Sequence, residues 1–121
     1  MRAATVWRAR DGSIPARLAL RARVAETAWE AARGLLGRRA PALDEGLWLP
    51  KCGAIHMMFM GYAIDAVFMD AEGRILRVAA GLRPWRLARA RGARATLETA
   101  AGSAARLDLR VGDRLRLDAE G

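Results

Sequence analysis

The strongest constraint on the fold is a pattern of short apolar segments separated by turn residues, and it is clearest between positions 63 and 80. Ala63 to Met69 is apolar and contains β-branched residues, Asp70 to Gly73 has the composition of a turn, and Arg74 to Ala80 alternates in character. Alternation with a period of two places one set of side chains on one face of a strand. This part of the chain therefore predicts a β-hairpin.

The same reasoning predicts other extended segments and a second hairpin around Asp11 to Ser13. The predicted strands outside the first hairpin are Thr5 to Ala9, Ala16 to Val24, Gly46 to Leu49, Ala93 to Thr99 and Arg114 to Asp118, and Gly102 to Leu109 is expected to form a turn or short helix. The expected fold is therefore mainly β, a small barrel or sandwich of about five to seven strands.

One short α-helix is predicted near residues 27–36, where the apolar residues change to helical spacing. Thr27 is the expected N-cap, and Glu30, three positions later, completes a capping-box pattern. Gly37 is expected to end the helix, and Pro41 prevents it from resuming.

The length of 121 residues predicts a single domain over residues 1–121. No uninterrupted apolar run approaches the length of a membrane span, and the N-terminal residues lack the apolar core of a secretory signal. The single cysteine cannot form an intrachain disulfide. These features predict a cytoplasmic protein without a membrane span, and we expect a monomer or weak dimer.

The formal net charge is +8, and almost all of the positive charge is arginine, with Lys51 as the only lysine. A basic surface attracts phosphate groups, which would suit nucleic acid. The chain is also rich in alanine, glycine and leucine, and codon bias in a high-GC genome produces this composition without selection for a ligand. Composition alone therefore does not favour a nucleic-acid binder.

The candidate site lies between Trp48 and Asp70, because this stretch contains the only cysteine, histidine and tyrosine of the chain. Cys52, His56 and Met60 recur every four residues, so they share a face of either a strand or a helix. Core packing explains the methionines and aromatics equally well. The pattern predicts a pocket lined by these three residues.

Two chemistries could use these side chains. Cysteine, histidine and methionine are soft ligands for copper, and cysteine with histidine suits zinc. Residues four apart on a strand are ~13 Å apart, however, which is too far for one ion. A thiol enzyme, with His56 as base for Cys52 and Asp65 orienting the imidazole, meets the same objection and lacks a glycine-rich oxyanion element. No cofactor can be named from the sequence.

Asp65 is a charged residue inside an apolar strand, so it must face solvent or find a partner. If Asp65 is buried, it needs a cation or several hydrogen-bond donors, and Arg33 of the predicted helix is the expected cation. A structural ion pair is favoured over a catalytic role.

A second candidate surface is the basic segment from Leu82 to Arg94. Trp85 is surrounded there by Arg83, Arg86, Arg89, Arg91 and Arg94. Arginines around an aromatic ring can bind phosphates and stack a base, or settle on an anionic lipid surface. A solvated basic loop is the simpler interpretation.

Four blocks of the sequence together resemble the domain of unknown function 192 family. They are Val24 to Arg38, Gly46 to Leu49 with the following apolar residues, Ile64 to Ile75, and Leu97 to Asp113, and the resemblance spans about residues 20–118. It implies a compact β-rich fold with a short helix and no established biochemical activity. His56 stands where secreted members have tryptophan, so the chain resembles a cytoplasmic subgroup with a C-x-x-x-H arrangement, and Ala63 replaces a frequent proline.

The sequence therefore favours a non-enzymatic binding or accessory module with a pocket around Cys52, His56, Met60, Asp65 and Arg33. Its partner would be a protein or a small ligand. The alternatives are a copper or zinc protein that uses Cys52, His56 and Met60, a thiol-dependent enzyme, and a binder of nucleic acid or an acidic partner through the Arg83 to Arg94 loop.

Overall fold

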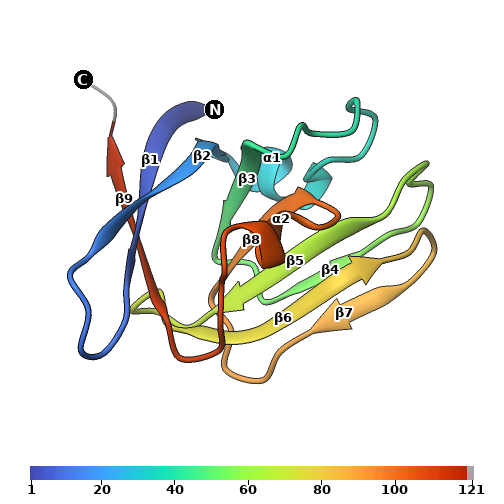
Figure 1. Ribbon diagram of the computed structural model, residues 1–121. Coiled ribbons are helices and arrows are strands. Elements are labelled where there is room, and N and C mark those ends of the chain that lie inside the picture. The colour runs from blue at the N-terminus through green and yellow to red at the C-terminus, as the bar shows by residue number, and fades with distance from the viewer. Residues whose placement is uncertain (120–121) are drawn as a thin grey trace.

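The computed structural model describes residues 1–119 and consists mainly of β-strands (Figure 1). In chain order the elements are β1 (Arg2–Ala9), β2 (Ala16–Val24), α1 (Ala28–Arg33), β3 (Glu45–Pro50), β4 (Ala54–His56), β5 (Ile64–Met69), β6 (Ile75–Leu82), β7 (Leu87–Arg89), β8 (Ala95–Ala100), α2 (Ser103–Arg106) and β9 (Arg114–Ala119). The last two residues of the predicted domain lie outside the described residues.

Seven strands form one strongly curved sheet in the order β6-β5-β8-β3-β2-β1-β9. The pairing of β2 with β3 is parallel, and the other neighbours are antiparallel. The sheet does not close into a barrel, although an isolated bridge between Arg74 and Arg114 joins the beginnings of its two edge strands. β4 and β7 form a separate two-stranded sheet.

The mainly β prediction is confirmed, but the number of strands is larger than expected. The part of the chain from 1 to 119 contains nine strands, because β4 and β7 were not anticipated. The turn or short helix expected at Gly102 to Leu109 contains the helix α2. Strands of three residues are too short to show a period-two pattern by themselves. They form here because β4 and β7 pair with each other across about thirty residues of chain.

The predicted helix is shorter than expected and ends at Arg33 instead of residue 36. Thr27 caps it as predicted, since its hydroxyl accepts a hydrogen bond from the Glu30 N–H at 3.0 Å. Gly34 ends the helix with φ 54° and ψ −129°, a backbone conformation that residues other than glycine rarely adopt.

The predicted hairpin of β5 and β6 is confirmed, and the chemistry of its turn is visible. Asp70 Oδ1 accepts hydrogen bonds from the N–H groups of Glu72 and Arg74, both at 2.9 Å. Gly73 has φ 83°, and a Cβ at this position would lie 2.1 Å from the carbonyl oxygen of Leu115. The turn therefore needs glycine both for its backbone conformation and for the close approach of β9.

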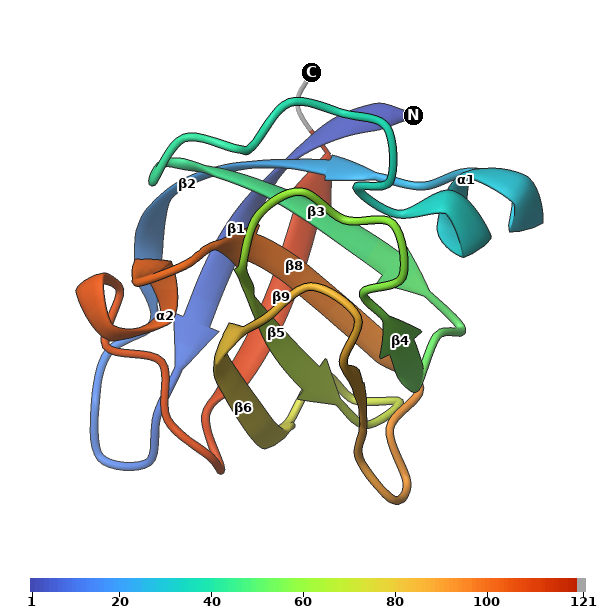
Figure 2. The ribbon, with the colours of Figure 1, turned by 90° about the vertical axis from the view of Figure 1, so that its right-hand side faces the viewer.

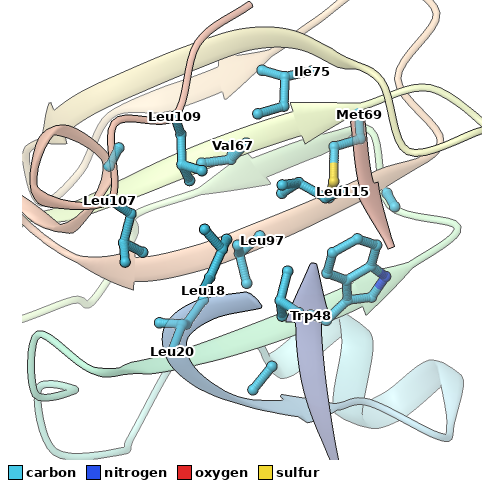
Figure 3. Close-up of a cluster of buried hydrophobic side chains, with 14 of the residues drawn as sticks. Leu18, Leu20, Trp48, Val67, Met69, Ile75, Leu97, Leu107, Leu109 and Leu115 are labelled. Carbon is cyan, nitrogen blue, oxygen red and sulfur yellow. The ribbon is translucent and has the colours of Figure 1, made fainter. Parts of the chain in front are cut away.

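Buried apolar side chains form two clusters, one on each face of the central strands. The first lies inside the curved sheet, where Leu18, Leu20, Trp48, Val67 and Leu97 point toward one another with residues of the C-terminal part (Figure 3). The second includes Leu47, Leu49, Ile55, Met57, Met60, Ile64 and Phe68 and lies beneath α1 and the β4-β7 sheet. β5 is buried along its whole length because both of its faces are covered.

Among residues 1–119, no helix has the length and apolar character that crossing a lipid bilayer would require.

Candidate functional site

A cavity of about 230 Å³ opens beside the second cluster, and it contains most of the predicted site residues. One wall is the segment 31–36 at the end of α1, and the opposite wall is the segment 52–57 together with Met60. Leu49 of β3 and Glu98 of β8 complete the lining. The cavity therefore lies between the helical segment and the two sheets.

The wall formed by residues 31–36 is anchored from both ends. The Thr27 cap holds the beginning of α1, and the Tyr62 hydroxyl lies 3.2 Å from the carbonyl oxygens of both Leu35 and Arg38, to either of which it can donate. Arg33 Nε donates to the Leu36 carbonyl at 2.9 Å. These bonds fix the turn after the helix, so this wall is preformed rather than created by a ligand.

Cys52, His56, Met60 and Arg33 all line the cavity. Met60 is buried, Cys52 and Arg33 are half-buried, and His56 is exposed. In β4 only Ile55 points into the core, so Ala54 and His56 lie on the opposite face of that strand. Cys52, His56 and Met60 therefore spread along one wall of the cavity, and Arg33 belongs to the opposite wall.

Cys52 is held in a way that does not activate its thiol. Its Sγ donates to the Ala54 carbonyl at 3.2 Å, and its own carbonyl accepts a hydrogen bond from Thr96 Oγ1 at 2.7 Å. Burial raises the pKa of the Cys52 thiol above its ordinary value. A nucleophilic cysteine needs the opposite shift, because the thiolate is the reactive form.

A metal ion needs several donor side chains placed around one point. Across residues 1–119, no three side chains of the types His, Cys, Asp and Glu are placed together so that they could hold a metal ion. Cys52, His56 and Met60 are lining residues of this cavity.

Asp65 does not line this cavity, and its predicted ion pair with Arg33 is wrong. Asp65 lies on β5 with Val67 and Met69, which pack in the first cluster, whereas Ile64, Ala66 and Phe68 pack on the cavity side. Its carboxylate accepts hydrogen bonds from the N–H groups of Gly81 at 2.8 Å, Gly102 at 3.0 Å and Ala104 at 2.9 Å. Asp65 thus links its own strand, β5, to the end of β6 and to the start of α2.

Glu98 also lines the cavity, and it was not among the predicted site residues. On the neighbouring strands Glu98 is paired with Ala66 of β5 and Leu47 of β3, both apolar, and its exposed fraction is only 5%. Its Oε1 has no hydrogen-bond partner within residues 1–119. Burial raises the pKa of Glu98 to about 7, although the N–H of Leu35 favours the ionised form.

Gly34 makes room for this carboxyl group. A Cβ at Gly34 would lie 2.7 Å from Glu98 Oε1, which is closer than ordinary contacts allow. The Glu98 carboxyl group can therefore lie against the end of the helix only because the residue there, Gly34, has no side chain. The signal in the sequence was an acid inside a predicted strand, the same observation that drew attention to Asp65.

A larger and more open hollow of about 430 Å³ lies on the other side of the segment 35–47. Its polar groups include Arg39, whose guanidinium is paired with Glu45 at 3.0 Å, and Arg21, which lies 3.9 Å from Asp44. Its charged groups are thus partly satisfied, and within residues 1–119 none of its lining side chains is a buried group without a partner, as Glu98 is.

The basic segment is only partly a loop, because β7 forms inside it and pairs with β4. Arg83, Arg86, Arg89, Arg91 and Arg94 are all exposed, as expected of a solvated basic segment. Trp85 is also exposed and contacts Phe59 of the β4-β5 loop, with ring centroids 4.8 Å apart. Phe59 was not predicted as part of this surface, because its contact with Trp85 joins two separate loops.

Fold and cavity together define a small mainly β domain with a preformed cavity beside a buried acid. The chain belongs to the domain of unknown function 192 family, DUF192, described as "Uncharacterized ACR", whose profile matches residues 10–117. This confirms the resemblance seen in the four sequence blocks.

Two solved structures share the fold. A protein of unknown function from Novosphingobium aromaticivorans DSM 12444 is 26% identical, with a TM-score of 0.77 over 94% of this chain and 84% of that one. A protein from Sinorhizobium meliloti 1021, named a "putative transcription regulator", is 22% identical, with a TM-score of 0.81 over 95% of this chain and 93% of that one. No curated protein matches the sequence.

Proposed function

We propose that the protein is a binding module whose cavity takes a small ligand with an apolar body and a cationic or N–H-donating group. The single observation that supports this is Glu98, a buried acid at the cavity whose Oε1 has no partner within residues 1–119. A buried polar oxygen without a partner costs free energy, and a ligand that donates to it recovers that cost.

The rest of the lining limits the chemistry and the size of the ligand. Leu49, Ile55, Met57 and Met60 are buried apolar residues, which suit an aliphatic group. At about 230 Å³ the cavity is smaller than the usual sites for drug-sized molecules. A short alkylammonium ion fits these requirements, since its charge would pair with ionised Glu98.

Such a ligand is expected to couple its binding to protonation. With the pKa of Glu98 raised to about 7 by burial, part of the free protein carries a protonated carboxyl at neutral pH. A bound cation favours the carboxylate, so binding should release a proton and lower the pKa of Glu98.

The test uses n-butylammonium as probe and follows backbone amide signals and the Glu98 carboxyl carbon by NMR. We expect saturable shifts at residues 31–36 and 52–60, a lower pKa of Glu98 in the bound state, and much weaker binding to Glu98→Gln. n-Butanol, which has the same apolar body without the charge, is the matched ligand control. Equal binding to the wild type and Glu98→Gln, or a Glu98 pKa that does not respond to the probe, would contradict the proposal.

We also propose a cytoplasmic location, which is supported by the single free cysteine, Cys52, in a chain of this size. Fractionation of cells that express the protein at its natural level would test it, and recovery outside the cytoplasm would overturn it.

A further inference from the structure

Two loops far apart in sequence are joined at one end of the molecule. The loop between β4 and β5 and the loop between β6 and β7 meet where Met57 N–H donates to the Arg86 carbonyl and Trp85 N–H donates to the Met57 carbonyl, both at 2.7 Å. In Figure 1 these loops form the right-hand end of the molecule, away from both termini, and Figure 2 looks onto them. Their positions are therefore fixed by backbone hydrogen bonds.

Four large apolar side chains project from this end. Met58 is 42% exposed, Phe59 72%, Trp85 60% and Leu87 75%, and we call these four residues the loop-tip surface. Scattered apolar residues on a surface are ordinary, but a contiguous group marks an interaction site. The contact of the Phe59 and Trp85 rings, tilted by 59°, shows that at least these two belong to one patch.

The backbone at both aromatic residues is unusual. Phe59 has φ 64° and Trp85 has φ 69°, values in the left-handed region that bulky side chains disfavour. Both residues hold this strained conformation while their rings point outward, so burial of the rings within the chain does not explain it.

The charge around the loop-tip surface has one sign. Arg83, Arg86 and Arg89 are exposed on the same loop and strand as Trp85 and Leu87. No aspartate or glutamate occurs from Gly73 to Leu97, nor from Gly46 to Ile64. The end of the molecule therefore carries apolar side chains within a positive field, and its complement is an apolar layer beneath negative charges.

We propose that the loop-tip surface docks onto the surface of an anionic lipid bilayer. Tryptophan, phenylalanine and leucine would enter the interface between headgroups and acyl chains, while the arginines contact lipid phosphates. Single-stranded nucleic acid fits less well, because Met58 and Leu87 offer no stacking surface and each ring already contacts the other. This surface does not include the buried acid of the cavity, so the inference stands apart from the proposed ligand.

The experiment measures co-sedimentation of the whole protein with vesicles. Vesicles of phosphatidylcholine with about 30% phosphatidylglycerol supply the negative surface, and pure phosphatidylcholine vesicles are the lipid control. We expect binding to the anionic vesicles that weakens as salt is raised, and little binding to the neutral vesicles.

The decisive variant is Phe59→Gly combined with Trp85→Gly. Glycine adopts the left-handed conformation readily, so these changes remove the rings without adding backbone strain. Because each ring offers about 150 Å² or more of apolar surface, we expect partitioning to weaken roughly tenfold or more. Circular dichroism and the thermal midpoint check that the variant is folded.

Trp29→Ser and Ile14→Ser are the matched controls, since Trp29 is 74% and Ile14 88% exposed at other places on the chain. Both should bind anionic vesicles like the wild type. Absence of binding to anionic vesicles, or unchanged binding by the folded double glycine variant, would overturn the proposal. Binding to a single-stranded oligonucleotide that depends on Phe59 and Trp85, without vesicle binding, would overturn it in favour of a nucleic-acid partner.

Discussion

Replacing Glu98 by glutamine should change how the free energy of unfolding depends on pH, because the pKa of this carboxyl group differs between the folded and the unfolded chain. In the unfolded chain the group has its ordinary pKa of 4.5, and in the fold burial raises the pKa to about 7. Between these values the folded protein holds a proton that the unfolded chain has released. The free energy of unfolding therefore falls as the pH rises through this window.

The size of the effect follows from the two pKa values. The difference between pKa values of 4.5 and about 7 corresponds to a loss of about 3 kcal/mol in the free energy of unfolding. This loss is absent below the pKa of the unfolded chain and complete above the pKa of the folded protein. Glutamine has nearly the same shape and does not ionise. Glu98→Gln should thus gain stability relative to the wild type as the pH rises, by about 3 kcal/mol in total.

Urea unfolding at intervals between about pH 4 and pH 8 measures this difference. The variant and the wild type are compared by their free energies of unfolding, and the informative quantity is how the gap between the two changes with pH. A lost hydrogen bond or altered packing would shift this gap by the same amount at every pH. Glu72→Gln removes an exposed carboxylate in the β5-β6 turn and controls for net charge. A difference between Glu98→Gln and the wild type that stays flat across this range would refute the reasoning.

Three further predictions concern the cavity and its surroundings. Gly34→Ala should cost about 2 kcal/mol or more in urea unfolding, because its Cβ would lie 2.7 Å from Glu98 Oε1 at φ 54°. Gly61→Ala, with no atom within 4 Å of the added Cβ, should cost far less, and equal losses would refute the steric account. Asp65→Asn should lower the free energy of unfolding by about 2 kcal/mol or more, since its carboxylate accepts from three backbone N–H groups; an unchanged urea midpoint would contradict this. Cys52 should react with iodoacetamide more slowly than free cysteine near neutral pH, because burial raises its pKa, and faster reaction would revive the thiol hypothesis.

Local patterns were sufficient for most of the sheet. The strand Ala16–Val24 has the predicted bounds, because its buried and exposed residues alternate without interruption. The end of the first helix was predicted less well. Gly37 was expected to end it, yet Gly34 does so, since the turn that follows must pass over Glu98 of a distant strand. Nothing near Gly34 in the sequence contains that information.

The mainly β class and the capped helix followed from the sequence alone. They did so because alternation, capping and turn formation depend on residues that are close together along the chain. Which acid belongs to the cavity depends on the tertiary structure. Asp65 and Glu98 are both acids within apolar strands, but the first faces three N–H donors and the second faces a cavity with an oxygen left unpartnered. Solvation and hydrogen bonding of a buried charge are set by atoms from distant segments, so the difference between these two carboxyl groups exists only in the folded chain.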